Sequence, residues 1–89
     1  MTNSEKEIIY QLSRRMFEDY MKKFKSTVYE AKEFRYRLSE KSDVATLEFE
    51  LRCAGFVKQT TYFWLSHKDA LPSVKEGVWY DVGDCVRCD

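Results

Sequence analysis

The sequence has little of what usually interrupts or specialises a chain. Its 89 residues include one proline and three glycines, which argues against long irregular loops. No apolar run is long enough to span a bilayer, and no basic stretch followed by an apolar one opens the chain, as it would in a signal peptide. We therefore expect a cytoplasmic protein without a membrane segment, folded as a single α+β domain over residues 1–89.

Net charge is also absent, since 15 Lys and Arg balance 15 Asp and Glu. Residues 1–42 carry ten basic and seven acidic side chains, whereas residues 43–89 carry five and eight. Nucleic-acid-binding domains usually have a marked basic excess, which this chain lacks. The asymmetry between the halves fits charge complementarity within the fold, or between two copies, equally well.

What the chain does have is apolar and aromatic residues, 44% and 16% of the total, enough for a packed core. The first segment predicts a helix over about 4–32, and Ser4 followed by Glu7 has the pattern of a capping box. Apolar residues recur there at steps of three and four, which indicates one buried face. They are Ile9, Leu12, Met16, Tyr20, Phe24 and Val28.

After this helix the hydrophobic period changes to two, which is typical of strands with one buried face. We predict four strands, from this pattern or from the turn residues on either side. They lie at about 34–39, 44–53, 56–66 and 78–86. The first two are joined by a short polar segment and predict a hairpin. The fold class we expect is α+β, with one long N-terminal amphipathic helix packed on a four-stranded antiparallel sheet in the order α-β-β-β-β.

The third strand segment is unusual because it has apolar side chains on both faces. The turn at residues 54–55 decides which face meets the helix, since a slip of one residue swaps the faces. A two-residue turn would place Lys58 beneath the helix with Thr60, Tyr62 and Trp64. A longer or bulged turn would instead bury Val57, Thr61, Phe63 and Leu65. We favour the longer turn, because it keeps a charged lysine out of the core.

With the longer turn, Tyr62 and Trp64 stand on the outer face of the sheet among charged side chains. Tyr, Trp and Arg are the residues that most often anchor protein interfaces, so we predict a partner-binding surface there. Its residues are Tyr62, Trp64, Arg35, Arg37, Glu48, Glu50 and Lys58. Two alternatives remain open at this point: the segment 67–77 could fold over the aromatics, or the strand could be central and covered on both sides.

A second functional hypothesis uses the same face to bind single-stranded nucleic acid, with aromatics stacking on bases and basic groups meeting phosphates. Glu48 and Glu50 count against it because they would repel phosphate, and they are better explained as cross-strand partners of Arg35 and Arg37. The RNA-recognition signature is also missing from the sequence.

The three cysteines and one histidine make a third hypothesis, a small module stabilised by zinc. The candidate ligands are Cys53, His67, Cys85 and Cys88, the right number and type for a structural site. Only the last two form a close pair, whereas zinc fingers usually have two. We therefore predict no metal and no other cofactor, and interpret the closing Cys-x-x-Cys as the end of a strand. Flanking aspartates disfavour a reactive thiolate there.

Catalytic patterns are lacking as well. The single His has no recognisable nucleophile context, and the glycines are isolated rather than arranged in a phosphate-binding loop. We predict a non-enzymatic protein-binding module, an inhibitor or adaptor, with a protein partner or a second copy of itself. In size and in its lack of motifs the chain is similar to the compact inhibitors that phages encode against host machinery, anti-CRISPR proteins among them, an analogy that no particular residue carries.

Overall fold

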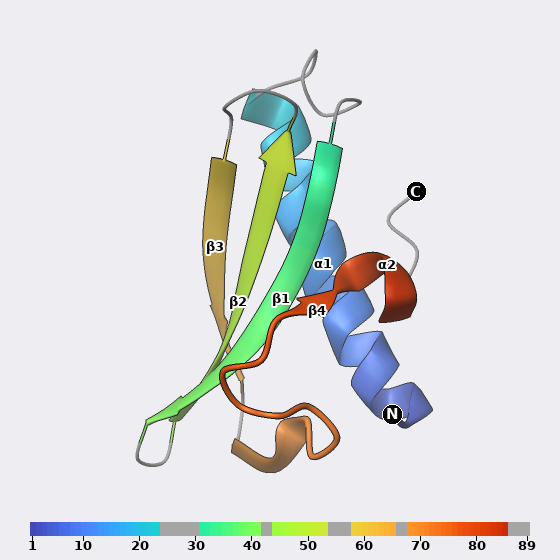
Figure 1. The fold of residues 1–89 in the computed structure, drawn as a ribbon, viewed down its shortest axis with the longest axis vertical. Coiled ribbons are helices and arrows are strands. Elements are labelled where there is room, and N and C mark those ends of the chain that lie inside the picture. Colours follow the sequence, from blue (N-terminus) through green and yellow to red (C-terminus); the bar gives the residue numbers. More distant parts are fainter. Residues whose placement is uncertain (24–30, 42–43, 54–57, 66–67, 86–89) are drawn as a thin grey trace.

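The computed structural model describes residues 1–23, 31–41, 44–53, 58–65 and 68–85. One N-terminal helix packs on one face of a four-stranded antiparallel sheet, which confirms the α+β fold class (Figure 1). The elements in chain order are α1 (Asn3–Lys23), β1 (Ala31–Lys41), β2 (Val44–Cys53), β3 (Lys58–Trp64), the short 3-10 helix η2 (Lys68–Ala70), β4 (Tyr80–Asp81) and α2 (Val82–Cys85). No described helix is long and apolar enough to cross a membrane.

The residue that caps the start of α1 (Asn3–Lys23) lies two positions earlier than predicted, at Thr2 instead of Ser4. The Thr2 N–H donates to Glu5 Oε1 at 3.0 Å, and the Glu5 N–H donates to Thr2 Oγ1 at 3.2 Å. This reciprocal pair is a capping box, so the predicted box of Ser4 and Glu7 is wrong. Glu5 is held in place from outside the helix, because Ser73 donates to it from both its N–H and its hydroxyl.

The buried face of α1 follows the predicted stripe as far as the helix is described. Ile9, Met16 and Tyr20 are fully buried, whereas Phe24 and Val28 lie outside the described residues. The predicted helix end at residue 32 is wrong, because Ala31 already pairs with Cys53 in the sheet. Strand β1 thus begins before the alternation of polar and apolar residues that indicates it in the sequence.

The sheet has the strand order β3-β2-β1-β4. Arg52 pairs with Lys58 across β2 and β3, so the connection between them is longer than two residues, as predicted. Phe63 consequently faces the helix, where the Arg15 guanidinium lies 5.1 Å from the centre of its ring. Thr61 and Leu65 share that face by alternation, and Val57 lies outside the described residues.

The fourth strand is much shorter than the predicted segment 78–86. Among the described residues of that segment, 78–85, only Tyr80 and Asp81 pair with β1, and α2 follows at once. Asp81 Oδ1 accepts a hydrogen bond of 2.7 Å from the Gly83 N–H, a side-chain-to-backbone bond that turns the chain out of the extended conformation. Val82 is fully buried, so its apolar character serves a helical turn rather than a strand.

The core lies between α1 and the inner face of the sheet, and is closed by the segment after η2 and by α2. Its aromatic members contact one another: Phe34 stacks on Phe17 of α1 with ring centroids 6.3 Å apart, and Tyr36 stacks on Tyr80 at 5.5 Å. Such pairs stabilise beyond the area that they bury. The buried apolar residues are Ile9, Met16, Tyr20, Tyr36, Leu38, Ala45, Leu47, Phe49, Leu51, Leu71, Val74 and Val82.

Candidate functional site

The sheet surface that points away from α1, here called the outer face, carries all seven residues predicted to bind a partner. In the antiparallel register Arg35 lies opposite Glu50, Arg37 opposite Glu48, and Glu48 in turn opposite Tyr62. Residues directly opposite each other project to the same side of a sheet. Trp64 and Lys58 follow Tyr62 by alternation along β3.

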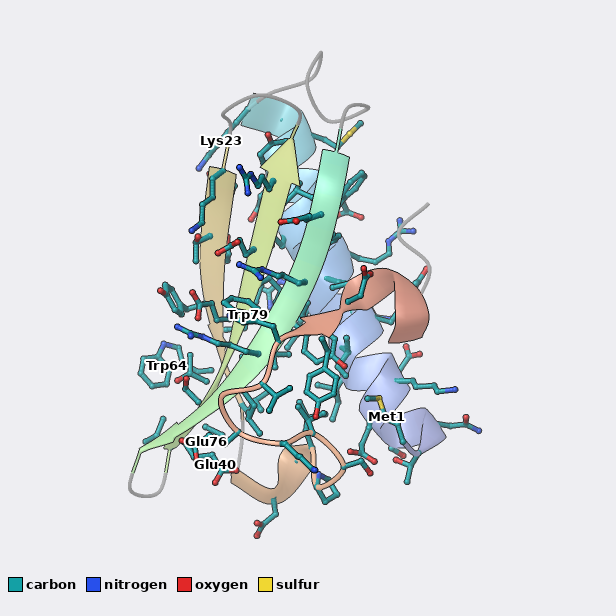
Figure 2. The ribbon with its side chains drawn as sticks, viewed as in Figure 1. Met1, Lys23, Glu40, Trp64, Glu76 and Trp79 are labelled. Atoms are coloured by element: carbon teal, nitrogen blue, oxygen red, sulfur yellow. The ribbon has the colours of Figure 1, made fainter. Side chains whose placement is uncertain are left out.

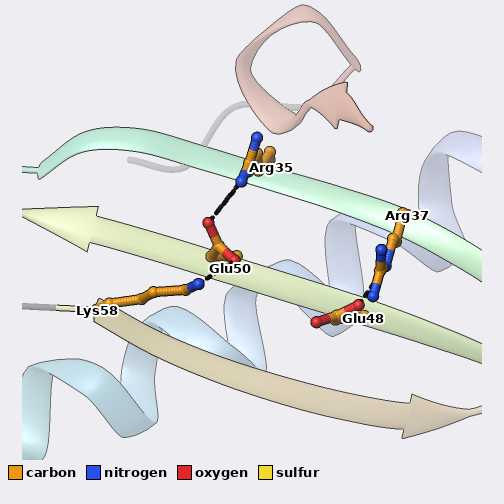
Figure 3. Close-up of polar contacts among 5 residues, drawn as sticks. All are labelled: Arg35, Arg37, Glu48, Glu50 and Lys58. Atoms are coloured by element: carbon orange, nitrogen blue, oxygen red, sulfur yellow. Dashed lines mark hydrogen bonds and ion pairs between the residues drawn. The ribbon is translucent and has the colours of Figure 1, made fainter. Parts of the chain in front are cut away.

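The centre of the outer face is a line of ion pairs (Figure 3). Glu50 accepts from Arg35 at 2.8 Å and from the Lys58 ammonium at 3.0 Å, and Glu48 is paired with Arg37. Both carboxylates are almost inaccessible, with 5% and 6% of their surface exposed. Burial opposes the ionisation of Glu50, but the hydrogen bonds from Lys58 and Arg35 outweigh it and lower the pKa of this carboxyl.

Trp79, which the sequence analysis did not single out, lies over the same ion pairs (Figure 2). The guanidinium carbons of Arg35 and Arg37 are 4.2 Å and 4.8 Å from the centre of its ring, within the range of a cation–π contact. Each of the two arginines therefore contacts one carboxylate and the ring of Trp79. The missed signal was the alternation of Trp79 with Tyr80, which places the indole on the outer face once Tyr80 is known to face the core.

Tyr62 and Trp64 are large aromatic side chains of the outer face that nothing in the described chain covers. Their exposed fractions are 59% and 74%, and Trp64 projects away from the sheet at the β3 side (Figure 2). Residues 68–77 do not lie over them, and β3 is an edge strand, so neither alternative explanation for the aromatics holds. Large aromatics exposed side by side on one strand are therefore the feature of this surface that needs an explanation.

The exposed aromatics border two hollows. One of about 720 Å³ lies on the outer face between them and the β1–β2 hairpin. It is lined by Arg37, Ser39, Val44, Thr46, Glu48, Tyr62 and Trp64. The other, of about 330 Å³, lies between α1 and the end of β3, where Trp64 meets Ile8, Leu12 and Leu65. Trp64 thus borders both hollows and is accessible from two sides of the molecule.

The predicted zinc ligands are only partly placed. Cys53 ends β2 and Cys85 ends α2, whereas His67 and Cys88 lie outside the described residues. The interpretation of the Cys-x-x-Cys as the end of a strand is wrong for Cys85, because the hydrogen bond between Asp81 and Gly83 starts a helical turn before it. Among the described residues no group of three or more Cys, His, Asp or Glu is arranged to hold a metal ion.

Compared with protein-family models, with curated proteins and with solved structures, the chain matches none of them.

Proposed function

We propose that this protein is a non-enzymatic, cytoplasmic protein-binding module, an inhibitor or adaptor, that binds a protein partner through Tyr62 and Trp64 on the outer face. The observation that carries the proposal is the exposure of these two large aromatics on a hydrogen-bonded strand. The strand fixes the backbone of both residues before binding, so little backbone conformational entropy is lost on association. Burying one such side chain contributes about 1.5–3 kcal/mol.

The surroundings of the two aromatics support a protein rather than a nucleic acid as partner. Arg35, Arg37 and Lys58, three basic groups of the outer face, are already paired with Glu48 and Glu50. Phosphate contacts would require unpaired basic groups, because binding of nucleic acids draws its affinity from neutralising phosphates. An apolar side chain entering the outer-face hollow, with polar groups at its rim, has the usual anatomy of a protein interface.

The test compares quantitative capture of partner proteins by three immobilised forms of the protein. The double variant Tyr62→Ser with Trp64→Ser should lose at least about tenfold in captured partner, since two anchors of an interface are removed. Val78→Ser is the matched control: Val78 is an exposed apolar residue outside both hollows, and its loss should leave capture unchanged.

Equal capture by the wild type and the double variant would contradict the proposal. A separate titration of fluorescent single-stranded oligonucleotides distinguishes the nucleic-acid hypothesis. Tight binding at low salt that weakens steeply as salt is added would favour that hypothesis instead, and we expect no such binding.

A further inference from the structure

The two edges of the sheet differ in whether their main-chain groups are already hydrogen-bonded. At the β1 edge the main chain is occupied: the Leu38 carbonyl accepts from the Gly77 N–H at 2.8 Å, and the Glu40 N–H donates to Glu76 Oε1 at 3.1 Å. Tyr36 pairs there with Tyr80 of β4. Short strands and covering loops of this kind are common ways to block pairing with another chain.

The β3 edge has no such cover in the described part of the chain (Figure 1). The strand is seven residues long, contains no proline, and has Lys58 as its only charged residue. The ammonium of Lys58 is directed to Glu50 on β2. The usual features that protect an edge strand are therefore weak, and its free N–H and C=O groups are available to pair with another strand.

The register identifies which main-chain groups are free. The Leu65 N–H donates to the Ala45 carbonyl at 2.9 Å, so the odd-numbered residues of this strand direct their hydrogen-bonding groups toward β2. In an antiparallel ladder these directions alternate from residue to residue. The groups that point away from the sheet therefore belong to Lys58, Thr60, Tyr62 and Trp64.

We propose that a second copy of this chain pairs antiparallel with the free edge of β3, with the two-fold axis at Thr61. In this register Thr60 lies opposite Tyr62 of the second copy, and Lys58 opposite its Trp64. Both are pairs between residues with outward main-chain groups, so each forms two hydrogen bonds. The inference goes beyond the proposed function, because it stands on the main chain of β3 rather than on its exposed aromatic rings.

Side chains on both faces suit this pairing. On the outer face each Trp64 meets the lysine stem and ammonium of the other copy, and each Tyr62 meets a threonine, a favourable neighbour for an aromatic in a sheet. No like charges come to lie opposite each other, because Lys58 is the only charged residue of β3. On the inner face Phe63 meets Gln59, and the two Thr61 side chains meet on the axis.

A second copy suits this edge because Lys58 and Trp64 stand at opposite ends of β3, so two antiparallel copies pair the lysine of each with the tryptophan of the other. Pairing about Thr61 uses all seven residues of Lys58–Trp64 in both copies, whereas a two-fold axis at Thr60 or Tyr62 would leave one end of the strand unpaired. The same surface patch then serves both subunits, as it must in a two-fold symmetric dimer. The dimer would have one continuous eight-stranded sheet.

The first test uses the wild-type protein. Sedimentation from about 1 μM to about 500 μM should show a monomer converting to a dimer, because association follows mass action. Hydrogen exchange at both ends of this range should then separate neighbouring amides. Those of Thr60 and Tyr62 should slow at least about tenfold in the dimer. Those of Thr61 and Phe63, which already bond to β2, should change little.

The second test is Thr60→Pro, which removes an outward N–H that β2 does not use and which an edge strand tolerates. It should weaken dimerisation at least about tenfold, while Thr60→Val, which keeps the N–H, should still dimerise. A monomer over the whole concentration range would overturn the proposal. So would a dimer in which the amides of Thr60 and Tyr62 exchange freely, whether or not the proline variant folds.

Partner binding through the aromatics and dimerisation through the β3 edge can be tested independently. Thr60→Pro leaves Tyr62 and Trp64 in place, so it should keep partner capture even as the dimer is lost. Loss of capture in this variant as well would mean that the partner requires the dimer.

Discussion

Glu5 is the residue whose chemistry the sequence hides most completely. It is 2% exposed and accepts hydrogen bonds from Thr2 and from Ser73, which lies 68 residues away. Burial opposes its ionisation, but these hydrogen bonds outweigh burial and lower the pKa to about 2, from 4.5. The Glu5 carboxylate thus takes part in the capping box of α1 and hydrogen-bonds the segment after η2 to the helix.

This carboxylate should make stability depend on pH. Because the folded-state pKa is depressed, its contribution is fully present above about pH 4.5 and is lost as the pH falls toward 2. Glu5→Gln should lower the free energy of unfolding by about 2 kcal/mol at pH 7 and flatten the loss between pH 5 and 2, measured by urea unfolding at each pH. Glu7→Gln, an exposed neighbour, is the control and should change neither; an unchanged pH profile in Glu5→Gln would contradict the assignment.

The two buried carboxylates of the outer face should respond differently to loss of their arginines. Glu50 keeps Lys58 when Arg35 is removed, whereas Glu48 has Arg37 as its one ion-pair partner among the described side chains. Arg37→Ala should therefore cost about 1–3 kcal/mol of unfolding free energy, and Arg35→Ala clearly less, because a buried charge without a partner is costly. Adding Glu48→Gln to Arg37→Ala should recover part of the loss. Equal losses in the two arginine variants would contradict this ranking.

At the scale of elements, Gly77 shows how a single backbone conformation closes the β1 edge. Its φ of 76° lies in the left-handed region, and a Cβ placed there would meet no atom within 4 Å. Gly77→Ala should therefore destabilise through backbone strain alone, by about 1 kcal/mol. Gly77→Asn should cost less, because asparagine tolerates this region. Thermal unfolding of both variants checks the order, and an alanine variant as stable as the wild type would show that the strain is relieved elsewhere.

The elements that could be predicted from the sequence are those with an uninterrupted period. The buried stripe of α1 and the alternation of β1 and β2 define the inner face, and excluding Lys58 from the core was enough to choose the register of β3. Since alternation also assigns the opposite face, the seven residues predicted to bind a partner could be placed together on the outer face.

The elements that could not be predicted depend on individual side-chain hydrogen bonds, one between distant residues and one between near neighbours, that no hydrophobic period reveals. The capping box of α1 lies at Thr2 and Glu5 because Ser73 holds the glutamate, and no local pattern contains that bond. Likewise β4 stops after two residues because Asp81 caps the next turn, although the apolar residues around it resemble a longer strand. Trp79 lies over two arginines because it alternates with Tyr80, which pairs with Tyr36 and faces the core, and this pairing could not be predicted either.

At the scale of the whole molecule, the charge asymmetry between the two halves of the chain is largely resolved inside the fold. Arg35 and Arg37 come from the basic half, and Glu48 and Glu50 from the acidic half. They pair because the boundary between the two halves lies between β1 and β2, which are neighbours in the sheet. This leaves little long-range field on the outer face, so the partner binding that we propose there would rely on shape and apolar contact rather than electrostatic steering.

The covered β1 edge has a consequence for how far assembly can proceed. Each molecule has one open edge strand, and both open edges are occupied when two molecules pair through β3. The bonds of Gly77 and Glu76 to β1 would then block further strand pairing at the two ends of the joint sheet. If both edges of the sheet were open, as β3 is, strand pairing could continue without limit and form fibrils. The same hydrogen bonds that complete the monomer would thus fix the stoichiometry at two and keep the protein from polymerising.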